Sequence, residues 1–309
     1  MSLIVAALGG NAIIKKGEQG TFEQQFRNTS ASMGYLAHLI RAGHQVVLTH
    51  GNGPQVGFIM IPVEAAAGKV PTAPLHVDVA QSQGSMGYMI AQSLINQLRA
   101  HGIATCVAAV MTQVLVNRDD LAMQQPTKPV GAFYSRNRAA ELERRGYAIV
   151  EDSGRGWRRV VPSPRPIRII EADIIKELVQ VGTLVVACGG GGIPVAEEHG
   201  ALRGVDAVID KDLASSLLAI ELQAAVLMFL TTVDRVALNY NTPQQVDLER
   251  LSLAEARQYL REGQFAPGSM GPKIEAAIEF MEHGGERAIV CRPEYVVEAL
   301  AGRAGTVIA

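Results

Sequence analysis

The sequence predicts an α/β fold in which a mainly parallel sheet lies between two layers of helices, a three-layer αβα sandwich. Short apolar runs rich in Val, Ile and Leu alternate along the chain with longer segments of helical periodicity. Such alternation is typical of parallel strands covered by helices on both faces. With 309 residues, of which 48% are hydrophobic and 19% charged, we expect one large domain spanning residues 1–309.

Seven apolar runs are the expected strands: 3–8, 45–49, 104–110, 183–187, 225–231, 287–291 and 305–308. Six intervening segments have the periodicity of helices: 23–42, 79–100, 172–181, 211–222, 253–262 and 272–283. The first strand begins almost at the amino terminus, where the apolar run is much shorter than the roughly 20 residues that span a bilayer.

One stretch, approximately residues 115–168, interrupts the alternation. From 118 to 168 there are eleven Lys and Arg against six Asp and Glu, and "YAIVEDSGRGWRRVV" has the pattern of a β-hairpin with a Ser-Gly-Arg-Gly turn. We expect an inserted, protruding β-hairpin subdomain here, a flap over a substrate. Nucleic-acid binding is the less favoured alternative, because few aromatic residues besides Trp157 accompany these charges.

Overall charge and cysteine usage exclude several classes of protein. The formal net charge of −2 gives no general attraction to nucleic acid or acidic membranes. Cys106, Cys188 and Cys291 have neither metal-ligand nor redox spacing, which indicates a reducing compartment. We therefore expect a cytoplasmic protein whose partners are small molecules, without nucleic acid or membrane.

Glycine clusters are the strongest local signal. Three follow expected strands, "LGGNA" at 8–12, "HGNGPQVG" at 50–57 and "CGGGGIPV" at 188–195, and "APGSMGPK" at 266–273 precedes a helix. Ligands of open α/β sheets bind beyond the carboxyl ends of strands, where glycine lets backbone N–H groups approach an anion. Each cluster alone could merely form a tight turn, but together they predict a polyanionic ligand.

Familiar phosphate motifs are absent or incomplete. The chain has no G-x-x-x-x-G-K-[ST] sequence, which excludes a P-loop nucleotidase. "GNGPQVG" has G-x-G-x-x-x-G spacing and only loosely resembles a dinucleotide fingerprint. Hydride transfer therefore remains a weak alternative.

The triplet Asp210-Lys211-Asp212 interrupts an apolar run at an expected helix start. Phosphoryl transfer depends on cations around the transferred group, and Lys211 together with Lys273, which lies in a glycine-rich turn, would supply them. The alternative is that the aspartates only cap the helix and that the lysine is solvated. The triplet and the four glycine clusters together favour a catalytic role in phosphoryl transfer over capping alone.

Eight segments resemble, in order and spacing, those of the carbamate kinase branch of the amino acid kinase family: "ALGGNA", "THGNGPQVG", "KPVGAFY", "VPSPRP", "CGGGGIPV", "VDAVIDKDLAS", "TTVDRV" and "FAPGSMGPKIEA". The resemblance runs from about residue 3 to the carboxyl terminus. It implies an open αβα sandwich, a homodimer, and reversible, Mg²⁺-dependent phosphoryl transfer between ATP and carbamate. It also implies that the useful direction makes ATP from ADP and carbamoyl phosphate, as in arginine or ureide catabolism.

The resemblance assigns roles to individual residues. The catalytic group would be Lys211, Lys273, Asp212 and Lys128, with Lys128 reaching from the flap over carbamoyl phosphate. Substrate and phosphate would lie in a backbone cradle of Gly9, Gly10, Asn11, Gly51, Asn52 and Gly53. Nucleotide would contact Asp210, Thr232, Asp234, Tyr240, Met270 and Gly271. No protein metal ligand is expected, because the nucleotide phosphates would carry Mg²⁺.

One departure from the wider family explains the triplet. Many relatives have a lysine two residues before the first glycine pair, where this chain has Ala7. Lys211 would replace that cation, with Asp212 orienting the lysines. Two alternatives remain: a kinase of another small carboxylic or amino acid, and a carbamoyl phosphate binder without catalysis. His50 is expected to be structural, because an already anionic carbamate needs no general base.

Overall fold

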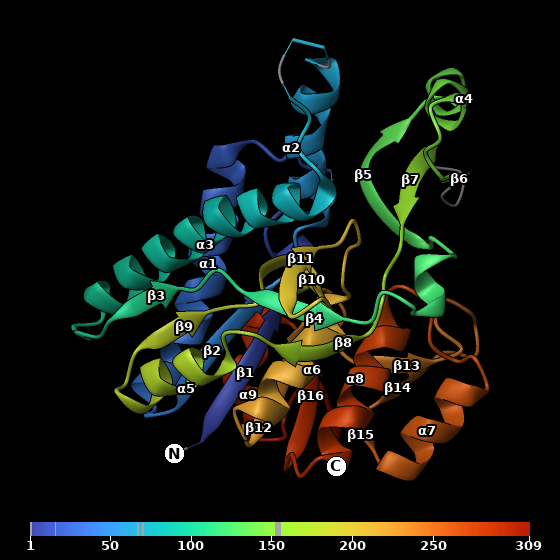
Figure 1. The fold of residues 1–309 in the computed structure, drawn as a ribbon. Helices are drawn as coiled ribbons and strands as arrows, with labels where there is room; N and C mark the ends of the chain where they lie inside the picture. Colours follow the sequence, from blue (N-terminus) through green and yellow to red (C-terminus); the bar gives the residue numbers. More distant parts are fainter. Residues whose placement is uncertain (1, 16, 67, 70, 152–155) are drawn as a thin grey trace.

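The computed structural model describes residues 2–309 except 16, 67, 70 and 152–155, and it leaves the side chains of Asn11, Glu64 and Ala132 undescribed. Its centre is an eight-stranded sheet (Figure 1). In spatial order the strands are β15 (Arg250–Leu251), β17 (Thr306–Ile308), β16 (Arg287–Cys291), β12 (Val226–Leu230), β1 (Leu3–Leu8), β2 (Gln45–His50), β9 (Leu184–Val186) and β3 (Val107–Ala109). All neighbouring pairs are parallel except β16 and β17.

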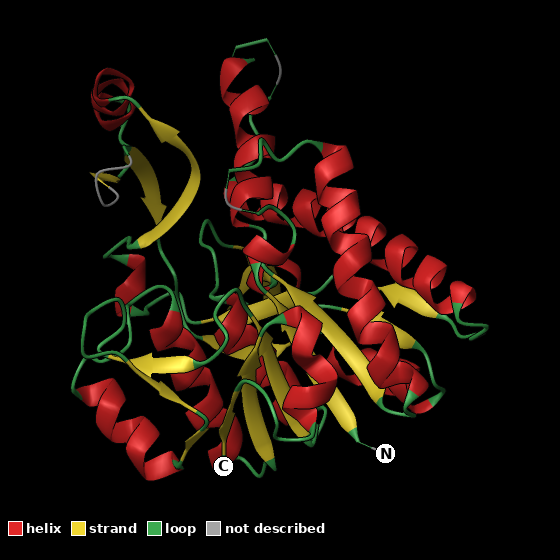
Figure 2. Ribbon diagram, turned by 180° about the vertical axis from the view of Figure 1, so that it is seen from behind, coloured by secondary structure: helices red, strands yellow, loops and turns green. Residues whose placement is uncertain are grey.

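Helices cover both faces of this sheet, as the sequence predicts (Figure 2). One face packs against α1 (Phe22–Arg41), α3 (Leu75–Ala100) and α9 (Val296–Leu300). The other packs against α5 (Ala172–Gln180), α6 (Lys211–Glu221), α7 (Leu253–Arg261) and α8 (Met270–Glu282). The predicted three-layer αβα class is therefore confirmed.

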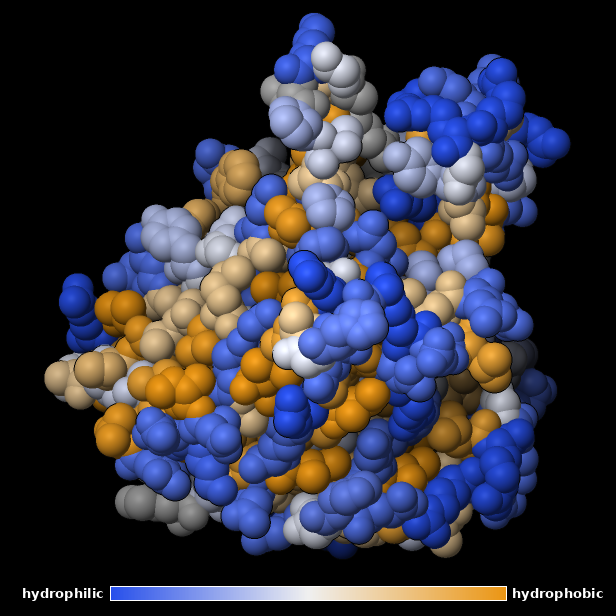
Figure 3. All heavy atoms as spheres, viewed as in Figure 1, coloured by the Kyte–Doolittle hydropathy of each residue, from blue (hydrophilic) through white to orange (hydrophobic). Residues whose placement is uncertain are grey.

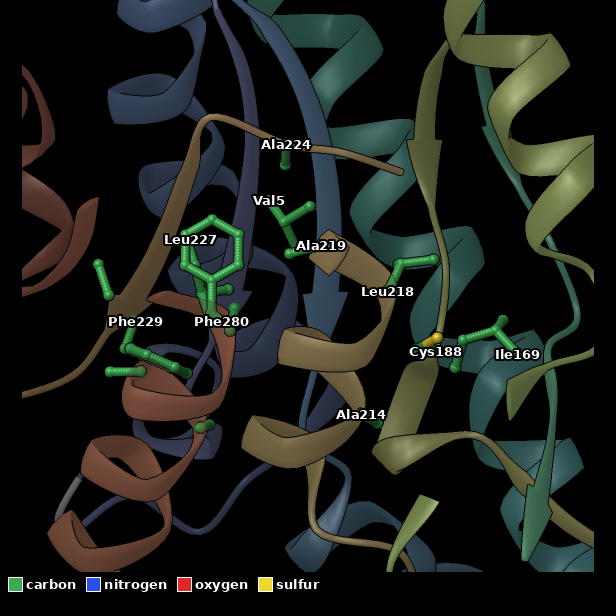
Figure 4. Close-up of a cluster of buried hydrophobic side chains, with 14 of the residues drawn as sticks. Val5, Ile169, Cys188, Ala214, Leu218, Ala219, Ala224, Leu227, Phe229 and Phe280 are labelled. Carbon is green, nitrogen blue, oxygen red and sulfur yellow. The ribbon is translucent and has the colours of Figure 1, made fainter. Parts of the chain in front are cut away.

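Strand β1 shows why its sequence is apolar throughout. Val5 and Ala7 face the α6 and α8 side, whereas Ile4, Ala6 and Leu8 face the α1 and α3 side. Successive strand residues point to opposite faces, so a strand buried on both sides needs apolar residues at every position. Figure 4 shows Val5 in the first of these cores, among side chains that include Leu218, Leu227 and Phe280.

A second, four-stranded sheet lies beside the main one. Its order is β11 (Ala201–Gly204), β10 (Ile193–Glu198), β4 (Gln113–Val116) and β8 (Pro166–Ile169). Strands β4 and β8 are antiparallel neighbours. The chain between them leaves this sheet at 117 and returns at 165.

That excursion carries its own small sheet, β5 (Lys128–Tyr134), β7 (Trp157–Val161) and β6 (Ile149–Glu151), with helix α4 (Arg136–Arg144). Strands β6 and β7 pair antiparallel as the predicted hairpin. Most of its predicted turn falls at 152–155, outside the described residues. Figure 1 shows the unit standing away from the main sheet, next to α2 (Gly53–Ala65).

The remaining elements are short. A β-ribbon pairs β13 (Val236–Leu238) with β14 (Val246–Leu248). The described residues also form the 3₁₀ turns η1 (Gly10–Ala12), η2 (Leu121–Met123), η3 (Gly189–Gly191) and η4 (Pro293–Tyr295). No helix among the described residues is long and apolar enough to cross a bilayer.

Candidate active site

The Asp-Lys-Asp triplet lies at the first turn of α6. Asp210 is the N-cap of this helix, and its Oδ1 accepts a hydrogen bond of 2.8 Å from the backbone N–H of Asp212. The capping alternative therefore holds for Asp210. It does not account for the lysine, which begins the helix with only 14% of its side chain exposed.

Asp212 joins the two lysines that the sequence singles out. Its Oδ1 accepts a hydrogen bond from Lys211 Nζ, and its Oδ2 accepts one of 2.9 Å from Lys273 Nζ. Lys273 comes from the first turn of α8, which packs against α6. Two ammonium groups from separate helices are thus held on opposite oxygens of one buried carboxylate.

The third predicted cation reaches the same place from the excursion at 117–165. Lys128, the first residue of β5, donates to Asp210 Oδ2. Asp210 in turn accepts from the backbone of Asp212. All four predicted catalytic residues therefore belong to one connected cluster, although Lys128 and Asp210 are 82 positions apart in the chain.

Burial shapes the charge of this cluster. Burial alone would raise the pKa of Asp212, but Lys211 and Lys273 outweigh it and hold that pKa well below its usual range. Burial lowers the pKa of Lys211, and the nearby Lys273 lowers it further, against the attraction of Asp212. The carboxylate stays ionised and keeps the two ammonium groups together.

Two amides of the predicted backbone cradle already have acceptors within the protein. Gly9 donates its N–H to Leu230 O (3.0 Å), and Gly51 donates its N–H to Leu8 O (3.1 Å). These two glycines continue the strand hydrogen bonding instead. Among the described residues, the N–H groups of Gly10 and Gly53 have no backbone acceptor, as expected for the first residues of η1 and α2. The Asn11 side chain lies outside the described part of the chain.

Gly51 lies close to the lysine of α6. A Cβ at this position would lie 3.1 Å from Cδ of Lys211 and 3.7 Å from the backbone N of Gly10. The first two glycine turns and the α6 lysine therefore meet at one edge of the sheet. Asn52 is buried, and its Nδ2 donates to Ser82 Oγ at 2.8 Å.

The third glycine cluster serves packing. Gly190, Gly191 and Gly192 all have positive φ and are buried. A Cβ at Gly190 would lie 2.2 Å from Asn52 Nδ2, and one at Gly191 would lie 2.2 Å from Ile209 O. The tight-turn alternative holds for this cluster, which supports the residues beside the site.

His50 is also structural. Its ring is buried with 1% exposed, and Nδ1 is 3.1 Å from Gly51 O. Burial lowers the pKa of His50 to about 4. The side chain is therefore uncharged at neutral pH.

A cavity of about 180 Å³ adjoins Lys273. It contains three of the six residues predicted to bind nucleotide, Thr232, Tyr240 and Met270, and Lys273 also lines it. Gly271 is buried in the same helix turn, where a Cβ would lie 3.2 Å from Ala266 O. The cavity and the lysine cluster are thus parts of one site.

The other two predicted nucleotide contacts lie elsewhere. Asp234 does not line the cavity; its exposed carboxylate accepts a hydrogen bond of 3.3 Å from Arg292 Nη1. Asp210 binds Lys128 and the α6 backbone instead.

Sequence reasoning missed several lining residues of this cavity. They are Thr231, Val233, Arg235, Ala237, Gln264, Phe265, Ala266 and Ser269. Six of them lie within the motifs "TTVDRV" and "FAPGSMGPK", and Ala237 and Gln264 lie next to these motifs, so the motifs located the cavity although individual lining residues were not named.

Comparison with known proteins identifies the family. Residues 2–292 match the model of the amino acid kinase family. The chain is 48% identical to a carbamate kinase of Thermococcus kodakarensis, over 99% of this chain and 98% of that protein. The chain belongs to the carbamate kinases of the amino acid kinase family. It is also 49% identical to the carbamate kinase of Pyrococcus furiosus, over 98% of each sequence.

Solved structures agree with this assignment. A carbamate kinase from Giardia lamblia bound to AMP-PNP superposes with a TM-score of 0.93 at 45% identity, covering 99% of this chain and 98% of that one. The kinases of this family are phosphotransferases, and this chain is an enzyme of that class. The hydride-transfer alternative is therefore wrong.

Proposed function

We propose that this chain catalyses reversible transfer of a phosphoryl group between ATP and carbamate, giving ADP and carbamoyl phosphate. The bond between the γ-phosphorus and the β,γ-bridging oxygen breaks as the carbamate oxygen bonds to phosphorus. The observation that carries the proposal is the pairing of Lys211 and Lys273 on the two oxygens of Asp212. Formation of ATP from carbamoyl phosphate is the proposed physiological direction.

The lysines would act on charge rather than by proton transfer. Phosphoryl transfer spreads negative charge over the equatorial oxygens, and fixed ammonium groups stabilise that charge. Lys211 lies against Gly51, where the N-terminal turns of α2 and η1 approach it, so it would contact the moving phosphoryl. Lys273 lines the nucleotide cavity and would contact the phosphates of ATP.

Residues 115–168 would act as a flap within a single kinase domain of residues 1–309. The support is Lys128, which spans from this segment to the triplet. Val130 and Val161 of the flap also pack with Val56, Met60 and Val208 of the main body, which anchors its base. Lys128 would exchange Asp210 for carbamoyl phosphate when substrate enters.

The arginines of the flap have a structural role in addition to attracting an anionic substrate. Arg159 stacks on Tyr147 at 4.3 Å, Arg158 on Phe133 at 5.1 Å and Arg136 on Trp157 at 5.5 Å. Such stacks stabilise a small sheet that has few buried side chains. Figure 3 shows a mostly hydrophilic surface over this unit. Arg136, Arg158 and Arg159 therefore help to hold the flap itself together.

Magnesium would be carried mainly by the nucleotide phosphates, whose charge it would neutralise when bound. Both oxygens of Asp212 are engaged by lysines, and both oxygens of Asp210 by Lys128 and a backbone N–H. Among the described residues, no group of three or more His, Cys, Asp or Glu could hold a metal. The residues fit a site whose metal enters with ATP or ADP.

The resemblance also supports a cytoplasmic homodimer with small-molecule substrates. Sedimentation velocity at two protein concentrations tests the dimer. A single species of about twice the 33.0 kDa chain mass is the expected result, and a 33.0 kDa species at both concentrations would contradict it.

The proposed reaction is tested by coupled ATP formation from ADP and carbamoyl phosphate in Mg²⁺. Acetylglutamate, aspartate and UMP are tried in parallel as phosphoryl acceptors from ATP. We expect ATP formation in the first assay and no transfer to the three acceptors. Transfer to one of them, with no ATP from carbamoyl phosphate, would assign the site to another small acid.

A further inference from the structure

Arg165 lies at the base of the flap. We call this base the neck: its outgoing limb follows β4 and contains Asp120 and Ala122, and its returning limb precedes β8 and contains Pro162 and Arg165. Arg165 stands between Pro164, which is buried, and Pro166, which begins β8. Each proline fixes its own φ and restricts the residue before it, so Arg165 is presented on a stiff backbone. Its side chain is 56% exposed and lies outside the lysine cluster.

The backbone of Arg165 joins the two limbs of the neck. Its N–H donates to Asp120 Oδ2 at 2.9 Å, and Asp120 Oδ1 accepts from Ala122 N at 2.9 Å in the outgoing limb. Nearby, the backbone N–H of Val208, in the segment leading to α6, donates to Pro162 O at 3.0 Å. The outgoing limb, the returning limb and the approach to Lys211 are therefore tied together at this point.

The side chain of Arg165 binds the helix that carries Lys273. Nη1 donates to Glu275 Oε1, and Nη2 donates to Glu279 Oε2 at 3.1 Å. The two glutamates are four residues apart and so lie on one face of α8. Glu275 follows Lys273 by two residues, within the same first turns of the helix. Figure 1 shows the neck beside α8.

We propose that Arg165 is a positioning residue that couples the flap to α8 and sets Lys273 relative to Lys211 and the substrate. The inference rests on the proposed kinase function. Its mechanical content is that the guanidinium of Arg165 ties the returning end of the flap, whose β5 begins with Lys128, to the first turns of α8, which carry Lys273. A shift of the first turn of α8 would change the position of Lys273 relative to Asp212 and Lys211.

Because these ion pairs are exposed, their effect on the position of Lys273 can be distinguished from their effect on the stability of the fold. Exposed pairs contribute little to the stability of a fold, because water screens them and the side chains lose entropy. A misplacement of about 1 Å in a catalytic group can slow a reaction by as much as about 100-fold. Loss of Arg165 should therefore affect turnover far more than folding.

The test is the Arg165→Ala variant, assayed for ATP formation from ADP and carbamoyl phosphate. We expect kcat to fall about tenfold and KM for ADP to rise severalfold, with KM for carbamoyl phosphate nearly unchanged. The midpoint of thermal unfolding should shift by less than about 3 °C. The matched control is Arg257→Ala, which removes the contacts of Arg257 with Glu282 at the other end of α8. It should leave all three kinetic values unchanged.

A double-mutant cycle tests whether Arg165 acts through the glutamates. Glu275→Gln with Glu279→Gln removes the same contacts from the helix side, and it should reproduce the kinetic change. Adding Arg165→Ala to that pair should then cause little further loss. Fully additive effects, or an Arg165→Ala enzyme with the kinetics of Arg257→Ala, would overturn the proposal.

Hydrogen exchange separates this inference from the proposed function. In Arg165→Ala, amides in the first turns of α8 and in the neck should exchange faster than in the original chain, whereas Arg257→Ala should leave these segments unchanged. Faster exchange in a chain that makes no ATP would support the coupling and reject the kinase assignment. Unchanged exchange at both segments would reject the coupling itself.

Discussion

At the scale of single residues, Asp212 is the residue that holds the two catalytic lysines together. A buried carboxylate is costly unless paired, and this one is paired twice. The same pairing holds two like charges, Lys211 and Lys273, close together in a site where little water can screen them. Their mutual repulsion would be relieved by an anion between them. The arrangement therefore favours binding of a phosphoryl group.

Lys211→Ala should lower kcat by about 100-fold or more, on the scale of removing a single donor to transition-state charge. The fold should remain, because Asp212 keeps Lys273 as a partner. Steady-state ATP formation measures kcat, and circular dichroism monitors folding. Lys176→Ala, on α5 away from the site, is the control. An unchanged kcat in Lys211→Ala would remove the role assigned to this lysine.

Lys128→Ala tests which ligand the flap serves. We expect KM for carbamoyl phosphate to rise more than KM for ADP, because Lys128 reaches the triplet rather than the nucleotide cavity. Initial rates with each substrate varied in turn provide both constants. A larger rise in KM for ADP would show that the flap covers the nucleotide instead.

At the scale of elements, the sequence predicted the buried strands most accurately. Strands β1 and β16 begin and end where the apolar runs 3–8 and 287–291 do. A strand buried on both faces leaves an uninterrupted apolar run, which is hard to mistake for a loop. Helices α1, α6 and α8 fall within two residues of their predicted limits.

Helix α2 was missed for a physical reason. Its sequence, "GPQVGFIMIPVEA", is apolar nearly all round and contains Pro62. Val56 and Met60 are buried, whereas Phe58 and Ile61 are exposed, so no apolar stripe distinguishes one face from the other. The pairing of Lys273 with Asp212, 61 positions apart, is likewise invisible to local pattern. Family resemblance, rather than periodicity, indicated that these residues act together.

The glycine turn η3 offers a test of packing at this scale. Gly190→Ala should destabilise the fold by about 3 kcal/mol or more, because φ is +66° and the new Cβ would meet Asn52 at 2.2 Å. Gly200→Ala is the matched control: φ is +76°, but no atom lies within 4 Å of the new Cβ, so strain alone should cost about 1 kcal/mol. Urea unfolding measures both. Equal costs would show that the contact with Asn52 is easily relieved.

At the scale of the whole molecule, stability should depend on pH through His50. Its pKa is lowered to about 4 in the folded chain from an ordinary value of 6.5. Between these values the unfolded chain binds a proton that the folded chain does not, so stability falls as pH falls from 6.5 to 4. The loss from this one group is about 3 kcal/mol.

Urea unfolding at several pH values between 4 and 6.5 measures this dependence. His50→Gln should flatten the slope, even though it also changes stability at neutral pH. His199→Asn, at an exposed position of positive φ that Asn tolerates, should retain the slope. A slope in His50→Gln as steep as in the original chain would assign the acid sensitivity to other groups.

One layer of helices and the excursion between β4 and β8 bring the pieces of the site together. Helix α6 supplies Lys211, α8 supplies Lys273, and the excursion between β4 and β8 supplies Lys128. These segments meet at the edge of the sheet where β1 and β2 end in glycine turns. The fold thus assembles a cluster of cations from parts of the chain that are far apart in sequence.

A crystal structure with ADP, Mg²⁺ and aluminium fluoride, which mimics a phosphoryl group in transfer, tests the central claim most directly. We predict the fluoride group between Nζ of Lys211 and Nζ of Lys273, each about 3 Å from a fluorine. We also predict the adenosine of ADP in the cavity lined by Thr232 and Met270. A fluoride group bound away from both lysines would contradict the account.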